Sequence, residues 1–305
     1  MTTTPRSRNE EGAPSHTNTR DQAPRPPSDW GGRWFDTTLD VRVEGRVRIF
    51  DLAVRLEPGM ARHPHHPEYS FEMVGRHDAD GPYRNGVTAA NEKFAMGGHL
   101  GTHMDGLGHV AKDNYVFGGR RVASGDELVD GLNVGSIEES TPIVTRGHLV
   151  DGEALFGREL TARDSFGPDE FESWFSARAA PTPGSVVLLR TGQMRWWSDP
   201  ERYLGLSTGL PGVNLDGARW LSDRGVVAVG SDTMNFEHKP SSELINLPVH
   251  VHLLVECGIP IMEMMQLEHL AAQHCYEFTF LAVPLRIGGA TGSPIRPLAI
   301  VNPTC

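Results

Sequence analysis

The chain has 305 residues, of which 38% are hydrophobic and 22% charged, and its formal net charge is −11. This composition is typical of a globular protein with a sizeable core, and the acidic balance argues against nucleic acid or an anionic membrane as a partner, because both need a basic face. No apolar run approaches the ~20 residues that a membrane-spanning helix needs.

Residues 1–30 are rich in Thr, Pro, Ser, Arg and Asn and hold no aliphatic cluster. A segment of this composition buries too little apolar surface to offset the entropy lost on ordering, so we expect a disordered tail. It also lacks the apolar region of a secretory signal. The fold is predicted to begin near residues 30–35, which makes residues 31–305 a single domain.

The first predicted strand covers residues 47–56, which mix β-branched and aliphatic side chains. Residues 56–71 follow as a predicted loop because of their prolines and glycine. This loop carries His63, His65 and His66, which look like a second metal cluster. Because prolines on both sides hold these rings in an extended segment, we favour contact with substrate or simple exposure over metal binding.

Residues 99–109 read HLGTHMDGLGH and place three imidazoles and one carboxylate in a short run, at His99, His103, Asp105 and His109. Zinc, manganese and iron(II) accept both kinds of ligand. The interspersed glycines let the backbone bend, so side chains at uneven spacing can converge on one point. The run therefore predicts a metal site on a tight loop or a strand-to-loop corner rather than on a regular helix.

The roles within this run follow from position. Asp105 lies two residues after His103, close enough to complete a His-His-Asp facet around one ion. His109 lies within reach of the open position of the ion without needing to be a ligand. The hydroxyl of Thr102 is expected to orient a ligand carboxylate.

Strands and helices alternate after a glycine-rich loop at residues 111–135, which is typical of an α/β domain. The strands read as nearly continuous apolar runs, and the helices carry apolar residues at three- to four-residue spacing. The predicted strands cover residues 142–150, 185–192 and 225–233, the predicted helices cover residues 168–179 and 213–225, and two further strands flank a glycine-rich loop within residues 278–301.

A second set of possible ligands lies at residues 247–270. The residues alone do not separate the histidines from one another, nor the glutamates, and the methionines among them are predicted to fill the core. Asp232 follows a buried strand, where α/β proteins usually collect functional groups, so it is a candidate for the substrate pocket, as are Glu237 and His238. The open alternatives are His250 or His252, and Glu263, Glu256 or Glu268.

The spacing of residues 99–109 resembles the signature His-x-Gly-Thr-His-x-Asp-x-Pro-x-His of the metal-dependent cyclase-like hydrolases, the family of bacterial kynurenine formamidase and isatin hydrolase. The chain departs from it at Leu107, where the family usually has proline. The resemblance implies a swivelling β/β/α-type fold with a mixed sheet and a homodimer or homotetramer. It also favours His250 and Glu263 as the further metal ligands.

On this resemblance we expect one or two divalent ions, zinc or manganese. The first would be held by His99, His103 and Asp105, and Asp105 would bridge to a second held by His250 and Glu263. His109 would carry the proton, and its imidazole is expected to titrate near the working pH. The residues predicted to contact substrate are His65, His66, Leu107 and Asp232.

The expected reaction is hydrolysis of a carbon–nitrogen bond in a formamide or cyclic amide of a small-molecule substrate. Lactone hydrolysis at the same site is the second choice. A non-haem iron oxygenase and a metal-stabilised binding protein without turnover are the rivals from other classes. The cysteines are odd in number and irregularly spaced, which favours a reducing cytoplasm over a disulfide scaffold; they are Cys257, Cys275 and Cys305.

Overall fold

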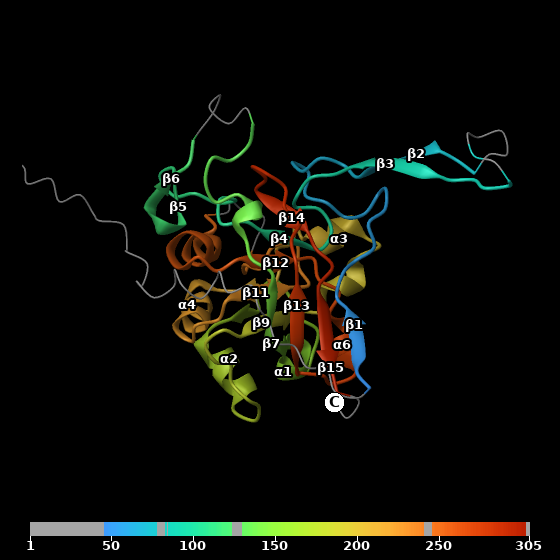
Figure 1. Ribbon diagram of the computed structural model, residues 1–305. Helices are drawn as coiled ribbons and strands as arrows, with labels where there is room; N and C mark the ends of the chain where they lie inside the picture. The colour runs from blue at the N-terminus through green and yellow to red at the C-terminus, as the bar shows by residue number, and fades with distance from the viewer. Residues whose placement is uncertain (1–45, 78–82, 84, 124–129, 241–245, 303–305) are drawn as a thin grey trace, which may run out of the picture.

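The computed structural model describes residues 46–77, 83, 85–123, 130–240 and 246–302 (Figure 1). The predicted disordered tail at residues 1–30 and the predicted start of the fold near residues 30–35 lie outside this range. The predicted extent of the domain therefore stays a prediction.

Nine strands form one mixed sheet that curls through the centre of the molecule (Figure 1). Its four middle strands run parallel, and antiparallel strands extend the sheet on both sides. The predicted α/β class with a mixed sheet is therefore confirmed. In order across the sheet, the strands are β1 (Arg48–Asp51), β15 (Leu298–Val301), β13 (Glu277–Ala282), β7 (Ile143–Asp151), β9 (Val186–Arg190), β11 (Ala228–Ser231), β12 (Ile261–Glu263), β4 (His103–Asp105) and β14 (Gly292–Pro294).

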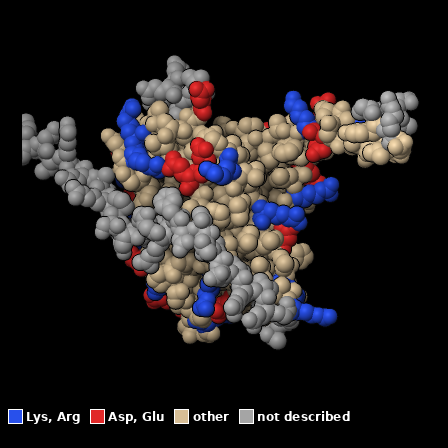
Figure 2. All heavy atoms as spheres, viewed as in Figure 1, with Lys and Arg blue, Asp and Glu red and all other residues tan. Residues whose placement is uncertain are grey.

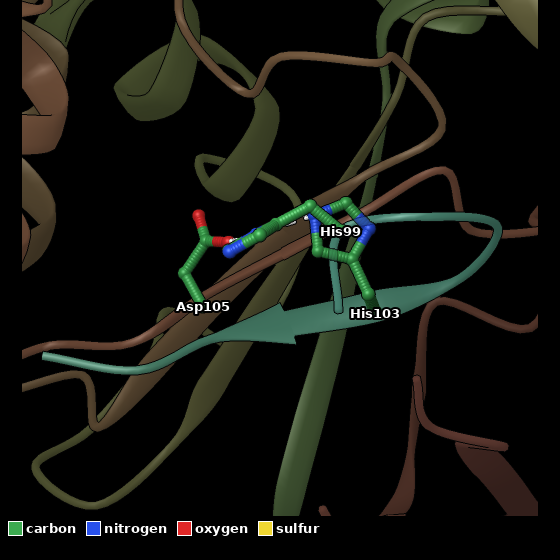
Figure 3. A group of neighbouring side chains, drawn as sticks. All are labelled: His99, His103 and Asp105. Carbon is green, nitrogen blue, oxygen red and sulfur yellow. Dashed lines mark hydrogen bonds and ion pairs between the residues drawn. The ribbon is translucent and has the colours of Figure 1, made fainter. Parts of the chain in front are cut away.

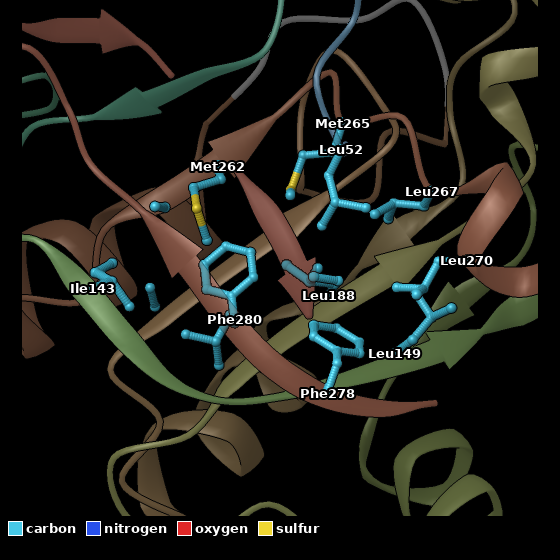
Figure 4. Close-up of a cluster of buried hydrophobic side chains, with 14 of the residues drawn as sticks. Leu52, Ile143, Leu149, Leu188, Met262, Met265, Leu267, Leu270, Phe278 and Phe280 are labelled. Carbon is cyan, nitrogen blue, oxygen red and sulfur yellow. The ribbon is translucent and has the colours of Figure 1, made fainter. Parts of the chain in front are cut away.

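The middle strands are buried on both faces. In β9, Val186 and Leu188 belong to one hydrophobic cluster, whereas Val187 and Leu189 belong to a second one. This division follows from the two-residue period of a strand, which sends successive side chains to opposite faces. The first cluster fills the inside of the curl, where β13 contributes Phe280 (Figure 4).

Helices cover the second cluster. The indole of Trp220 on α4 stacks on Phe171 of α2, with 5.0 Å between the ring centroids. A proline opens α2, and the Glu170 carboxylate accepts a hydrogen bond from the Gly167 amide, which satisfies a donor left free at the helix start. The helices are α1 (Gly152–Phe156), α2 (Pro168–Phe175), α3 (Pro200–Leu204), α4 (Leu215–Asp223), α5 (Pro248–His250), the π-helix η6 (Val251–Cys257) that continues α5, α6 (Glu268–Ala272), and the 3-10 turns η2 (Phe117–Gly119), η4 (Ile137–Glu139) and η5 (Gln193–Trp196).

The buried strands and the two amphipathic helices lie where the sequence predicted them; β7 has the expected length, shifted by one residue, and the others are somewhat shorter than expected. The N-terminal strand is an exception, because it ends at Asp51 rather than reaching residue 56. Residues 278–301 hold parts of three strands, β13, β14 and β15, rather than two. Short paired strands also occur outside the predicted strands: β2 (Ser70–Gly75), β3 (Asn91–Ala95), β5 (Tyr115–Val116), β6 (Arg120–Arg121), β8 (Ser165–Phe166) and β10 (Gly212–Val213).

Strands β2 and β3 form a hairpin that projects away from the body of the molecule (Figures 1 and 2). Its side chains include large apolar groups that face solvent: Phe71 is 48% exposed and its cross-strand neighbour Phe94 is 59% exposed. Met73 and Val74 are exposed beside them. We call residues 70–75 and 91–95 the apolar hairpin.

The cysteines differ from the sequence-based expectation. Cys275 is buried and takes part in a disulfide bond, whereas Cys257 is a free thiol. The disulfide bond of Cys275 argues against the reducing compartment that the number and spacing of the cysteines favoured. Within the described residues, no helix combines the length and the apolar character needed to cross a bilayer.

Candidate metal centre

The histidine-rich run forms the corner where the chain enters β4. Gly101 has a φ of +64°, a left-handed conformation that suits glycine, and its carbonyl oxygen lies 2.8 Å from Nδ1 of His103. His103 and Asp105 are two residues apart on the strand, so their side chains lie on the same face (Figure 3). The predicted strand-to-loop corner is confirmed.

Strand pairing brings the distant glutamate to this corner. β12 runs antiparallel to β4 with Glu263 directly opposite His103, and Oε2 of Glu263 lies 3.5 Å from Nε2 of His103. On the other side of β4, Gly292 of β14 stands opposite Asp105. The three shortest strands of the sheet thus place side chains from two distant parts of the sequence against each other.

His250 reaches the same place from the helix formed by α5 and η6. Its Nε2 atom lies 3.3 Å from Oε1 of Glu263, and its Nδ1 atom lies 2.8 Å from Oε2 of Glu237. The same carboxylate of Glu237 accepts the Val249 amide at 3.0 Å. Glu237 therefore fixes both the start of the helix and the orientation of the His250 ring.

His99 completes the group from the loop before β4. Its Nδ1 atom lies 2.7 Å from Oδ1 of Asp105, and its Nε2 atom lies 2.8 Å from the hydroxyl of Thr291. The ring packs directly against the backbone of Gly292, because a methyl group at this position would lie 2.6 Å from Cε1 of His99.

These side chains offer two overlapping sets of metal ligands. Ligand atoms of His99, His103 and Asp105 lie within 4.8 Å of one another, and so do those of Asp105, His250 and Glu263. Asp105 belongs to both sets. The four residues other than His99 are at most 6% exposed.

Two atoms in the centre show that the donors fit a cation. Nε2 of His103 and Oδ2 of Asp105 are buried without a hydrogen-bond partner among the described residues. Buried polar atoms are nearly always satisfied, and an unsatisfied one costs about 1–3 kcal/mol. A divalent cation would satisfy both at once, since imidazole nitrogen and carboxylate oxygen are its usual ligands.

The charges in the centre support one another. Burial alone would favour the protonated form of Asp105, but His109, His103 and His99 outweigh it and hold the pKa of this carboxyl well below its usual range. Burial likewise opposes protonation of His250, but hydrogen bonds to Glu237 and Glu263 raise its pKa to about 10. The ionised carboxylate of Asp105 therefore attracts positive charge to the centre.

His109 lies beside these ligands. Its ring is tilted over that of His99 with 3.9 Å between the centroids, and no described residue hydrogen-bonds it. Burial lowers the pKa of His109 to about 3, and the charge of Asp105 opposes this only in part. Burial thus favours the neutral form of this ring, whereas the sequence led us to expect titration near neutral pH.

Two of the four predicted substrate contacts lie on the loop beside the centre. His66 is half-buried, with Nδ1 3.1 Å from the carbonyl oxygen of His99, whereas His65 is exposed. Leu107 is half-buried and packs against the hydrophobic cluster under the helices.

Asp232 is fully buried. Its carboxylate accepts hydrogen bonds from the amide and hydroxyl of Thr191 and from the amide of Gly192. This residue therefore holds the turn after β9, and its contact with substrate stays a prediction. Thr102 differs from the sequence-based expectation, since its hydroxyl donates to the Met264 carbonyl and accepts from the Val54 amide rather than orienting a ligand carboxylate.

The structure distinguishes between the candidate metal ligands that the sequence left open. His252 faces away from the centre, where its ring contacts Ser222 and Glu256. Glu268 forms an ion pair with Arg190 at 2.7 Å. The methionines of this segment are buried, as predicted: Met262, Met264 and Met265.

From the sequence, Glu237 was only a candidate for the substrate pocket, and Thr291 was not predicted to contribute to the site. The role of Glu237 depends on a contact with a residue thirteen positions later, which no local pattern reveals. Thr291 lies in a segment read as a glycine-rich loop. The feature of the sequence that could have pointed to Thr291 is its hydroxyl group next to glycines.

Known proteins resemble this chain over most of its length. The family model described as "Putative cyclase" matches residues 50–238. The chain is 25% identical over 253 residues to the kynurenine formamidase of Bacillus cereus, covering 83% of this chain and 96% of that protein. It is 24% identical over 273 residues to the isatin hydrolase of Roseibium aggregatum, covering 85% and 94%. A crystal structure of a novel cyclase matches with a TM-score of 0.73 and 25% identity, covering 83% of this chain and 86% of that one.

Proposed function

Because the chain belongs to the Cyclase family, we propose that it is a metal-dependent hydrolase that cleaves the carbon–nitrogen bond of a formamide or a cyclic amide. The observation that carries this proposal is the convergence of two ligand sets on Asp105, with buried atoms that lack a partner among the described residues. The names of the two relatives, a formamidase and an isatin hydrolase, support the same type of bond.

The proposed ligands follow the two sets. His99, His103 and Asp105 would hold one cation, and Asp105 would share in holding a second one with His250 and Glu263. Nitrogen and carboxylate donors of this kind suit zinc or manganese. A divalent cation in this position polarises a carbonyl group and makes water more acidic.

His109 is the proposed proton carrier. Its ring lies against His99 and has no hydrogen-bond partner among the described residues, so a ring nitrogen is open to take a proton from the attacking water. It then returns this proton to the leaving nitrogen as the carbon–nitrogen bond breaks, which releases a carboxylic acid and an amine. The buried ligands hold the reacting carbonyl away from bulk water.

The test combines metal analysis with substrate hydrolysis. His103→Ala should lose the metal, whereas His109→Ala should keep it and lose activity by roughly 100-fold to 10,000-fold. His252→Ala, on the same helix as His250 but facing away, is the control and should change neither. Full activity in a metal-free preparation would contradict the proposal.

A panel of N-formyl aromatic amines, cyclic amides and lactones distinguishes the substrate classes. Lactone opening uses the same tetrahedral chemistry, so it is the second choice if amides are not cleaved. The oxygenase alternative loses support, because its triad needs three donors whereas five converge here. Oxygen consumption with iron(II) and a 2-oxo acid would instead support the oxygenase alternative.

We propose a homodimer or homotetramer as the working form. The apolar hairpin supports this, since exposed apolar groups of this size commonly mark a protein interface. A small molecule is the proposed substrate, and the cytoplasm remains the predicted location.

A further inference from the structure

The histidines of the centre do not all turn the same ring nitrogen towards it. In His103 and His250, the Nδ1 atom contacts an oxygen outside the two ligand sets, the Gly101 carbonyl at 2.8 Å and the Glu237 carboxylate at 2.8 Å. Their Nε2 atoms face the proposed ligands instead. Glu263 lies 3.5 Å from Nε2 of His103 and 3.3 Å from Nε2 of His250.

His99 is turned the other way. Its Nδ1 atom lies 2.7 Å from Oδ1 of Asp105, which belongs to both ligand sets (Figure 3). Its Nε2 atom lies 2.8 Å from the hydroxyl of Thr291. An imidazole binds a cation through a nitrogen lone pair, so the proton of the neutral ring must then be on the other nitrogen. If His99 binds through Nδ1, its Nε2 atom must therefore donate a hydrogen bond to Thr291.

The Thr291 hydroxyl suits this contact because a hydroxyl both donates and accepts hydrogen bonds. Without a cation, it can donate to Nε2 of His99 while Nδ1 donates to Asp105. With a cation at Nδ1, the same hydroxyl accepts from Nε2. No other group among the described residues hydrogen-bonds this hydroxyl, whereas that of Thr102 already has both a donor and an acceptor as partners.

The backbone fixes Thr291 beside the ring. Its carbonyl oxygen accepts the Gly106 amide at 2.9 Å, just after β4 ends. The next residue, Gly292, begins β14 and pairs with Asp105, and the ring of His99 packs against it. The hydroxyl is thus held by the same strand pairing that positions the proposed ligands, so its contact with the ring does not depend on a loose loop.

We propose that Thr291 is a positioning residue that accepts the Nε2 proton of His99 and thereby directs Nδ1 of this ring to the cation. The inference rests on the proposed function, because it requires a cation at His99. Thr291 acts on the ring and not on the cation. Loss of its hydroxyl should therefore weaken metal binding without removing the site.

Chelator competition for zinc tests the hydroxyl. Thr291→Val removes it at similar volume and should weaken zinc binding by about 10- to 100-fold, the range for loss of an outer partner of a ligand histidine. Thr291→Ser keeps the hydroxyl and should retain the wild-type affinity. Thr145→Val is the control, because it removes a hydroxyl that donates to the Gly184 carbonyl, a contact of β7, and should leave zinc binding unchanged.

Nitrogen NMR of protein labelled at histidine gives a reading that depends on neither turnover nor affinity. The signals of His99 are those missing from His99→Gln. In the zinc-loaded wild-type protein, they should show a proton on Nε2 and none on Nδ1, and Thr291→Ser should show the same pattern.

The wild-type spectrum decides if Thr291→Val does not fold. Equal zinc affinities of the valine and serine variants, or a proton that stays on Nδ1 of His99 in the zinc-loaded wild-type protein, would overturn the role of Thr291. A wild-type protein that binds no divalent cation would instead count against the proposed function.

Discussion

Glu237 and Glu256 make the same kind of contact in two places. Each carboxylate contacts the Nδ1 atom of a histidine on the helix formed by α5 and η6, at 2.8 Å for His250 and 2.9 Å for His252. Only the first histidine faces the metal centre. Comparing the two therefore tests a glutamate that contacts a proposed metal ligand against one that contacts a histidine outside the centre.

Glu237→Ala should lower metal affinity by about 10- to 100-fold, because ligand histidines lose orientation and basicity without their outer partner. Glu256→Ala should leave the affinity unchanged. Competition with a coloured chelator measures both variants. Equal affinities for the two variants would show that the orientation of His250 does not depend on Glu237.

His148 is a titratable group that lies outside the centre. It lies on β7, 1% exposed, and neither ring nitrogen has a hydrogen-bond partner among the described residues. Burial lowers its pKa below 6.5, the charge of Glu277 opposes this, and that of Arg146 adds to it. The folded protein thus resists protonation of a ring that the unfolded chain protonates freely.

Because the two states bind this proton differently, the free energy of unfolding depends on pH. As the pH falls through about 6.5, the unfolded state takes up the proton first, so the free energy of unfolding decreases. His148→Phe should reduce this acid sensitivity, because phenylalanine fills similar space without titrating. Urea unfolding at pH 7.5 and pH 5.5 measures it, with His269→Ala at an exposed position as the control. An unchanged pH dependence in His148→Phe would assign the effect to other groups.

The residues of the first ligand set could be predicted because they lie together in one short run with glycines between them. The choice between His250 and His252 could not, because both lie on one helix and only its packing shows which ring faces β12. The role of Asp232 could not be fixed from the sequence for a related reason. The end of a strand can hold a turn as well as a substrate.

At the scale of elements, the parallel strands were predictable because burial on both faces requires apolar residues throughout. β14 was not, since its residues are Gly, Ser and Pro, which are uncommon in strands. It is a strand because β4 offers it an edge to pair with. Tertiary pairing, rather than local preference, thus forms the part of the sheet that carries the centre.

Glycine in β14 has a structural reason that can be tested. Gly292→Ala would place a methyl group 2.6 Å from Cε1 of His99, so the ring must move and metal affinity should fall. Gly288→Ala is the matched control, because its methyl group would meet the Glu138 carboxylate at an ordinary 3.5 Å. Chelator competition and thermal unfolding measure both. A normal affinity in Gly292→Ala would show that His99 does not hold the metal in this position.

At the scale of the whole molecule, the apolar hairpin is the part that the sequence did not predict. Its strands lie in a segment read partly as loop, and its residues are exposed rather than packed on the body (Figure 2). Such an arrangement is stable when another surface covers the apolar groups. A second copy of the chain is the proposed cover.

Replacing both phenylalanines of the hairpin tests this assembly. Phe71→Ser with Phe94→Ser should shift the protein towards the monomer in sedimentation velocity, because the exposed cross-strand pair would lose its apolar surface. Tyr115→Ser, at another exposed aromatic residue, is the control. An unchanged sedimentation coefficient in the double variant would place the interface elsewhere.

The pairing of β4 with both β12 and β14 has a consequence for biosynthesis. β4 emerges from the ribosome early, but its two neighbours belong to the last part of the chain to be translated. The nascent polypeptide therefore carries an unpartnered histidine-rich edge until synthesis is nearly complete. Insertion of the proposed second cation would therefore be a late event, because Glu263 is among its ligands, and a truncated chain that ends before residue 261 should emerge without that ion.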